Sequence, residues 1–317
     1  GHQTGIVGIY FAKVIVFSVI FIYTIFYLAR SAPAIPSFGL MKKLLSYGLP
    51  IIPLILLMPF LTVSDRYFLH VFSSVEDIGR YGIAYKFGML INMLLVIPVQ
   101  RSWGPQMFQV GNLIEENKQI HRDITFYYSY IGLFIILGLC LFAETILLIF
   151  ANEDYLSVSW VIPWISLAYF IGGFKIFLQA SASIADRTDL FIKTGIYTII
   201  SNLLLNYILI KNFSIQGAVS STILSYLILV ILLFFSSKRV SKIKWPIKRI
   251  IHGASIASFL IITFYILKKN DLDYEIIIKV FLLILFPIIS FLTNLIGNRE
   301  IKGLRSLWNS FFKKVLA

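Results

Sequence analysis

Long apolar runs dominate the chain, and short polar segments separate them. A helix needs about 20 apolar residues to cross a hydrocarbon core of about 30 Å. By this criterion the pattern predicts about nine transmembrane helices, joined by connections too short for a separate polar domain. We therefore expect an all-α, polytopic membrane bundle. The predicted spans are residues 5–28, 49–69, 81–100, 124–150, 158–183, 190–210, 215–235, 250–267 and 276–296.

Composition agrees with this interpretation. Hydrophobic residues make up 58% of the chain, charged residues only 14%, and the mean hydropathy is +0.86. Soluble domains carry about 25% charged residues, so an ordinary soluble fold is excluded. The single Cys and four scattered His predict neither a disulfide framework nor a metal site. No phosphate-binding glycine loop or hydrolase motif is present, so we expect no cofactor and no enzyme activity.

Basic residues concentrate in alternate connections. Of the 28 Lys and Arg, 19 lie in five segments, and the positive-inside rule makes these segments and the C-terminus cytoplasmic. The net charge of +13 then reflects membrane topology, and we expect no nucleic-acid partner. The basic run from Lys238 to Arg249 would lie against anionic membrane lipid. The five segments are residues 29–48, 101–122, 184–193, 236–249 and 297–317.

Three lysines fall within predicted spans, where a charge costs at least about 2.5–3.5 kcal/mol. Lys175 shares a polar helix face with Gln179, which favours a water-filled cavity over snorkelling to the headgroups. Lys86 and Lys13 lie closer to the predicted outer surface. Snorkelling explains Lys86 as well as a functional role does, and Lys13 fits both interpretations equally.

Other polar and helix-breaking residues in the spans suggest structural or gating roles. Asn202 and Asn206 are four residues apart, which favours hydrogen bonds between helices over a functional site. Prolines weaken helical turns, and transporters use such broken helices beside their substrate path; a static kink is the alternative. The prolines concerned are Pro50, Pro53, Pro59 and Pro98.

Two blocks of sequence carry recognisable motifs. The first and more specific block consists of residues 44–53, 64–69, 79–86 and 103–105, and the second, less specific block is residues 202–222. The first block resembles the polysaccharide-repeat flippases of bacterial envelopes, within the multidrug, oligosaccharidyl-lipid and polysaccharide exporter superfamily. The second block is similar to a later helix pair of that superfamily, and together the matches extend over about residues 1–235.

The resemblance implies two lobes of six helices around a central cavity, with an extra helix pair at the C-terminus. About five N-terminal helices of that plan are missing, so the chain resembles a fragment whose residue 1 is not the native start. The implied divisions are 1–28 as the last helix of the first lobe, 29–48 as the cytoplasmic inter-lobe segment, 49–235 as the second lobe, 236–249 as a basic loop, 250–296 as the extra pair and 297–317 as a basic cytoplasmic tail.

The resemblance also implies a substrate, a polyprenyl-pyrophosphate-linked oligosaccharide, and a location in the bacterial cytoplasmic membrane. Polysaccharide polymerase and chain-length machinery are further candidate partners. On this hypothesis Lys175 attracts the pyrophosphate, and Lys86, Lys13 and Arg66 are weaker candidates. A structural use, in which Asp65 pairs with Arg66 or the two cap their span, is slightly favoured for this pair.

Two alternative functions remain open. One is a drug or cation exporter of the same superfamily, although three intramembrane lysines favour an anionic cargo. The other is a membrane-embedded polysaccharide polymerase or ligase, which would be expected to carry a large outer loop with catalytic Arg or His. No extramembrane segment exceeds about twenty residues, which favours transport.

Overall fold

The computed structural model describes residues 4–31, 37–48, 63–109, 115–184, 189–238, 245–268 and 275–297, and all regular elements in these ranges are helices. Seven helices are long and apolar enough to cross a membrane, which confirms the predicted all-α polytopic class. The chain divides into two compact units, residues 1–53 and 54–317, which are described separately.

The first unit contains α1 (Thr4–Ser31) and α2 (Phe38–Gly48). Within α1, the stretch Tyr10–Ser31 is long and apolar enough to span a membrane, and all its side chains are exposed. An apolar helix that is exposed all round in this way requires lipid or other helices around it.

The second unit begins with helical residues 63–72, followed by α4 (Val75–Gly88), π-helix η1 (Asn92–Val96) and α5 (Ile97–Gln109). The side chain of Ser74 caps α4 by accepting a hydrogen bond from the backbone N–H of Asp77 at 3.1 Å. Pro98 lacks an N–H and its ring crowds the carbonyl four residues earlier. The π-helix η1 ends two residues before Pro98, so a local change of helix geometry lies next to this proline.

Two predicted spans are interrupted by a single turn residue. Residues 124–150 divide into α6 (Glu115–Leu141) and α7 (Ala143–Phe150), and residues 158–183 divide into α8 (Val161–Gly173) and α9 (Lys175–Ile184). The short 3-10 helix η2 (Glu153–Val158) joins α7 to α8.

The break between α8 and α9 follows two glycines. Glycine destabilises a helix because its backbone loses more conformational freedom on folding than that of other residues. A side chain would not fit at Gly172 or Gly173, because neighbouring aromatic rings occupy that space. A Cβ on Gly172 would lie 2.5 Å from Cδ1 of Tyr226, and one on Gly173 would overlap the hydroxyl of Tyr128. Close packing at this point therefore requires glycine, and it weakens the helix just before Lys175.

The element α10 (Asp189–Lys238) is two helical arms that meet at Ser214, whose backbone has φ 46° and ψ −124°. Hydrogen bonds join Asn206 to Ser221 and Asn202 to Ser225, so the arms run antiparallel about Ser214. The arms correspond to the predicted spans 190–210 and 215–235. The strained turn at Ser214 is held by a 2.9 Å hydrogen bond between the hydroxyls of Ser214 and Ser73.

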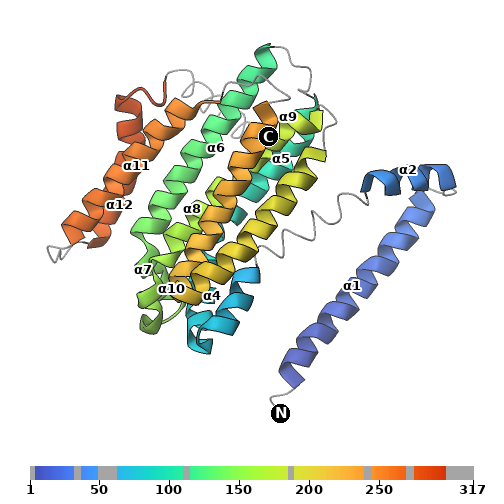
Figure 1. Ribbon diagram of the computed structural model, residues 1–317, viewed down its shortest axis with the longest axis horizontal. Coiled ribbons are helices and arrows are strands. Elements are labelled where there is room, and N and C mark those ends of the chain that lie inside the picture. Colours follow the sequence, from blue (N-terminus) through green and yellow to red (C-terminus); the bar gives the residue numbers. More distant parts are fainter. Residues whose placement is uncertain are drawn as a thin grey trace, which may run out of the picture. The chain divides into compact units, whose positions relative to one another are not determined.

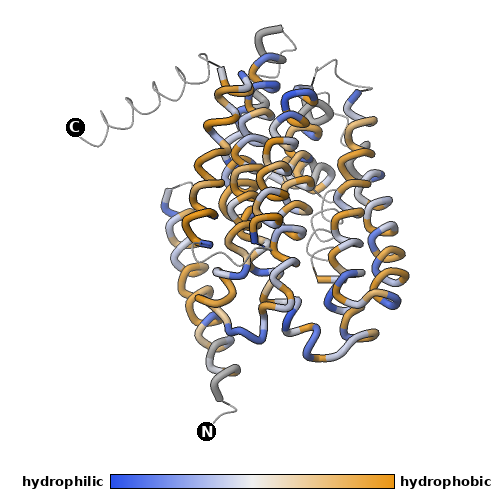
Figure 2. The backbone as a smooth tube through the Cα atoms, turned by 90° about the vertical axis from the view of Figure 1, so that its left-hand side faces the viewer, coloured by the Kyte–Doolittle hydropathy of each residue, from blue (hydrophilic) through white to orange (hydrophobic). Residues whose placement is uncertain are grey.

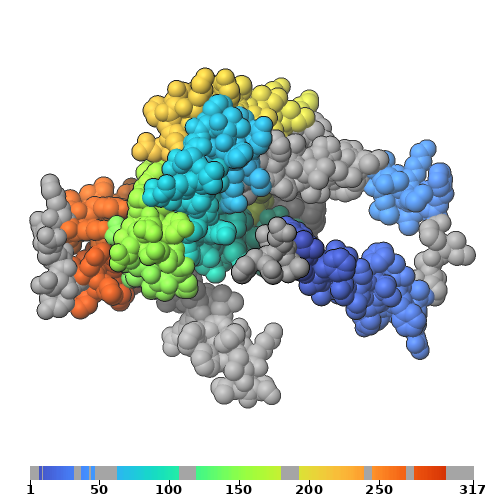
Figure 3. Space-filling model, turned by 90° about the horizontal axis from the view of Figure 1, so that it is seen from below, coloured from blue at the N-terminus to red at the C-terminus, as the bar shows by residue number. Residues whose placement is uncertain are grey.

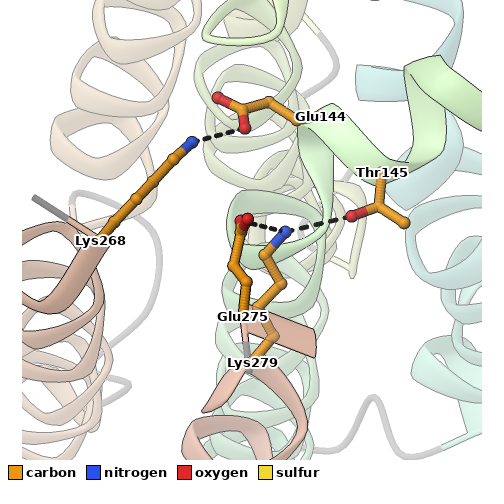
Figure 4. Close-up of polar contacts among 5 residues, drawn as sticks. All are labelled: Glu144, Thr145, Lys268, Glu275 and Lys279. Carbon is orange, nitrogen blue, oxygen red and sulfur yellow. Dashed lines mark hydrogen bonds and ion pairs between the residues drawn. The ribbon is translucent and has the colours of Figure 1, made fainter. Parts of the chain in front are cut away.

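The last two helices, α11 (Ile247–Lys268) and α12 (Glu275–Leu292), pack on each other and on α6. Polar contacts to α7 hold one end of this pair (Figure 4). The ammonium of Lys268 lies 2.5 Å from Glu144 Oε2. Lys279 pairs with Glu275 Oε1 at 2.7 Å and donates to the hydroxyl of Thr145 at 3.1 Å.

Polar residues lie near both ends of the second unit, where its helices begin and end. Figure 2 shows hydrophobic colour along the helix middles and hydrophilic colour near many of the helix ends. α4, α7 and the lower part of α10 lie toward one end of this unit, the lower end of Figure 1. Viewed from this end, α4 lies between the α7–η2 segment and α10 (Figure 3).

The ion pair on α12 predicts an asymmetric effect of mutation. The Lys279 side chain is 4% exposed, whereas that of Glu275 is 41% exposed. Glu275→Gln leaves a buried ammonium without its carboxylate, while Lys279→Met leaves a carboxylate that water can reach. Glu275→Gln should therefore lower the free energy of unfolding by at least about 1 kcal/mol more than Lys279→Met, measured by denaturant unfolding in detergent micelles. Equal losses would contradict this account of the pair.

Candidate functional site

A buried hydrogen-bond network joins the two arms of α10 to helical residues 63–72. Ser64 donates to Asn202 Oδ1 at 2.8 Å and accepts from Asn206 Nδ2 at 3.0 Å. Asn202 Nδ2 donates to Ser225 at 2.9 Å, and Ser221 donates to Asn206. All five side chains are buried. Their mutual bonds satisfy polar groups that lipid could not, and this is the interhelical use that the four-residue spacing predicts.

A buried carboxylate, that of Asp65, lies next to this network. Its Oδ2 accepts a 2.5 Å hydrogen bond from the hydroxyl of Tyr81, and its Oδ1 accepts one from the backbone N–H of Arg66 at 2.7 Å. Asp65 is 1% exposed and Tyr81 is fully buried. The hydrogen bond to Tyr81 thus connects residues 63–72 to α4. The hydrogen bond between Asp65 and Arg66 is made by the backbone N–H of Arg66 and not by its guanidinium.

The guanidinium of Arg66 lies over an aromatic ring. Its Cζ is 5.2 Å from the centre of the Tyr85 ring, an arrangement that stabilises a cation by cation–π attraction. Its Nε is buried and has no hydrogen-bond partner within the part of the chain that the structure describes. Arg66 therefore keeps donor capacity that an anionic group could use.

Tyrosines continue this polar region into the bundle. The hydroxyls of Tyr85 and Tyr169 are 2.7 Å apart and hydrogen-bonded, and the Tyr169 ring centre is 5.7 Å from that of Tyr226. Tyr226 in turn packs against Gly172, three residues before Lys175. Tyr85, Tyr169 and Tyr226 thus contact one another in sequence, from Arg66 toward the break between α8 and α9.

Lys86 projects from a different face of the second unit. Its side chain is exposed, and it lies near the start of the apolar part of the 32-residue helical stretch Val75–Gln106, as its predicted span 81–100 implies. Gly82 and Gly79 lie about one and two turns before it, and a Cβ on either would meet nothing within 4 Å. This face of α4 is therefore open and lined by small residues beside a cation.

The remaining candidates are dispersed. Lys175 is the first residue of α9 and is half-buried, as is Gln179 one turn later. Lys13 belongs to the first unit, where its ammonium lies 5.7 Å from the centre of the Tyr10 ring. The gating candidates Pro50, Pro53 and Pro59 lie outside the described residues.

The sequence interpretation missed the tyrosines of this region and the roles of two serines. Ser221 and Ser225 both hydrogen-bond to the asparagines of α10. The signal that could have identified the tyrosines is their depth. Tyr prefers the membrane interface, so a Tyr far inside a span needs a hydrogen-bond partner. The residues concerned are Tyr81, Tyr85, Tyr169 and Tyr226.

Chemically, the second unit offers hydrogen-bonding hydroxyls beside Arg66, and further cations at separate positions. No group of three or more His, Cys, Asp or Glu able to hold a metal occurs among the residues that the structure describes. Arg66, Lys86 and Lys175 could attract an anion, while the acidic group of Asp65 is already hydrogen-bonded. The arrangement suits binding of a polar, negatively charged molecule.

These features define the second unit as a polytopic helical membrane bundle with cations on its spanning helices. A family model described as "polysaccharide biosynthesis protein" matches residues 3–110. The match confirms the family resemblance over that third of the chain, which includes Asp65, Arg66 and Lys86. No curated protein sequence is significantly similar to the chain.

Among solved structures, the chain is similar to one described as the lipid II flippase MurJ in an inward closed conformation. The sequence identity is 17%, the TM-score is 0.64, and the alignment covers 84% of this chain. The aligned region spans 58% of the length of the flippase chain. At this identity the likeness establishes a shared fold.

The buried pair of Asp65 and Tyr81 predicts a stability effect. Tyr81→Phe removes the hydroxyl donor and leaves Asp65 Oδ2 without that bond, which should lower the free energy of unfolding by about 1–3 kcal/mol. Tyr67→Phe is the matched control, because Tyr67 is 65% exposed. Denaturant unfolding in micelles measures both variants. Equal stability of the two variants would show that the hydrogen bond contributes nothing.

Proposed function

We propose that this chain forms part of a flippase for polyprenyl-pyrophosphate-linked oligosaccharide repeat units. It would act in the bacterial cytoplasmic membrane during surface polysaccharide biosynthesis. The sugars and pyrophosphate of such a substrate cannot cross hydrocarbon unaided, because removing polar and charged groups from water is costly. A water-filled cavity with cations on its wall offsets that cost. Alternating access then requires rocking of two lobes around the cavity and no catalytic step.

The exposed Lys86 ammonium beside the open glycine face of a membrane-spanning helix carries this proposal. An ammonium that faces hydrocarbon is costly, up to about 2.5–3.5 kcal/mol at the centre of a spanning helix. Facing water inside a larger assembly would remove this cost, and the open glycine face around Lys86 leaves room for a bulky substrate. The flippase-like fold and the polysaccharide-biosynthesis match support the same interpretation.

The signs of the charges favour an anionic cargo over a cationic drug. The donor capacity of Arg66 and the exposed ammonium of Lys86 would attract a pyrophosphate. Asp65 would serve a cationic cargo poorly, because Tyr81 and the Arg66 backbone already occupy its oxygens. Lys175 and Gln179 are proposed to extend the polar surface of the second unit, and Lys13 is a separate candidate on α1.

The proposed setting follows from the charge distribution and the pathway. The C-terminus and the basic connections would be cytoplasmic by the positive-inside rule. Proposed partners are membrane lipid, the lipid-linked oligosaccharide, and the polymerase and chain-length machinery that would use the flipped repeat unit.

The lysines provide the experimental test. In the gene product that contains this chain, Lys86→Ala and Lys175→Ala should each slow flipping about tenfold, the factor expected for one lost charge-assisted hydrogen bond. Lys86→Arg and Lys175→Arg should retain most of the rate. Lys211→Ala is the control, since Lys211 is exposed beside the turn at Ser214.

The rate is measured in proteoliposomes as the appearance of labelled lipid-linked oligosaccharide in the opposite leaflet. Reconstituted amounts and unfolding temperatures are matched across the variants. Unchanged rates in both Ala variants would overturn the proposed role of these cations.

A further inference from the structure

A cavity of about 480 Å³ lies where α10 ends and α11 begins, outside the region described above. Its volume is in the range of about 300–1,000 Å³ that is typical of small-ligand sites. None of the side chains that the structure describes in its lining is charged. The lining includes five aromatic residues: Phe174, Phe177, Phe234, Phe235 and Trp245.

The cavity opens at an exposed apolar face of the second unit. Ile231 and Phe235 both line it, and they are 50% and 60% exposed. Its one hydroxyl, that of Thr125, already donates to the carbonyl of His121 at 2.7 Å. Apart from the indole N–H of Trp245, the lining that the structure describes offers contact area to an apolar occupant and no free hydrogen-bonding side chain to a polar one. A hydrocarbon chain entering sideways from the membrane fits these properties.

A cation lies at the rim of the cavity. Lys238, in the last turn of α10, places its ammonium 4.5 Å from the ring centre of Phe234, which lines the cavity. Trp245 also lines the cavity and directly precedes α11, and Trp favours the headgroup level of a bilayer. The apolar cavity thus opens beside a positive charge at interfacial depth.

We infer that this cavity binds one anionic phospholipid of the surrounding leaflet, with an acyl chain inside and its phosphate at Lys238. The bound lipid would come from the surrounding membrane, because the exposed part of the lining faces outward. A lipid of the adjacent leaflet needs no route through the bundle to reach it. Bound there, the lipid would fill the space between α9, the second arm of α10 and α11. The inference stands independently of any transported substrate.

The test uses Trp245 as the reporter. The full chain is reconstituted in phosphatidylcholine vesicles that contain a minor fraction of phosphatidylglycerol. Bromine, which quenches Trp fluorescence on contact, is carried on the acyl chains of one lipid or the other. The contribution of Trp245 is the difference between the unaltered chain and Trp245→Phe. Brominated phosphatidylglycerol should quench it about fivefold more per lipid, the factor that one lysine supplies at a membrane surface.

Matched variants separate the charge from the cavity. Lys238→Gln should remove most of the lipid preference, whereas Lys211→Gln, at the other end of the same hairpin, should keep it. Ile231→Phe narrows the cavity and should reduce quenching by both lipids. Its control is Ile208→Phe, since Ile208 is 52% exposed and does not line the cavity.

Two results would overturn the inference. Equal quenching by the two brominated lipids in the unaltered chain would exclude an anionic lipid at this position. Quenching that is unaffected by Ile231→Phe would place the acyl chain outside the cavity. The vesicles contain no oligosaccharide lipid, so neither result depends on the proposed flippase activity.

Discussion

Buried polar side chains in membrane-spanning helices must satisfy one another, because hydrocarbon supplies no hydrogen bonds. The second unit depends on this constraint where residues 63–72, α4 and α10 meet. Ser64 bridges Asn202 and Asn206, and the adjacent Asp65 binds Tyr81. A single helix–helix hydrogen bond in lipid contributes only about 0.6 kcal/mol on average. The connected hydrogen bonds therefore act together to fix how residues 63–72, α4 and α10 align, and no single one of them would suffice.

The same constraint separates structural polar groups from those available for function. Asp65 has partners at both carboxylate oxygens, so it acts as part of the frame. Arg66, one residue later, rests on the Tyr85 ring and keeps Nε unpaired within the described residues. Lys86 faces outward from α4. An interior whose polar groups are largely hydrogen-bonded, with cations such as Lys86 on exposed faces, is suited to attracting an anion to the surface of the bundle.

Hydropathy alone was sufficient to predict the fold class and most of the spans, because lipid imposes a fixed helix length. The breaks at Phe142 and Phe174 could not be predicted in this way, since they depend on contacts such as Gly173 against Tyr128. The tight reversal at Ser214 likewise depends on Ser73, a residue distant in sequence.

Among the site residues, the intramembrane lysines stand out in the sequence because their cost in lipid is high. The paired use of Asp65 and Tyr81 does not, because it arises when two helices meet. From the sequence alone, a tyrosine in a span is interpreted as an apolar or interfacial residue, because its hydrogen-bond partners are not known. Spacing within one helix indicates which residues share a face. Only the packing shows whether that face meets another helix, as for Asn202, or remains open, as for Lys86.

The central claim is that the gene product containing this chain moves a lipid-linked oligosaccharide between leaflets. Its most direct test is the leaflet distribution of that lipid in cells depleted of the protein, measured with a membrane-impermeant sugar-modifying probe. Our account predicts that lipid-linked single repeats accumulate on the cytoplasmic face, protected from the probe. Accumulation of single repeats on the outer face would contradict it and assign the protein to a step after translocation.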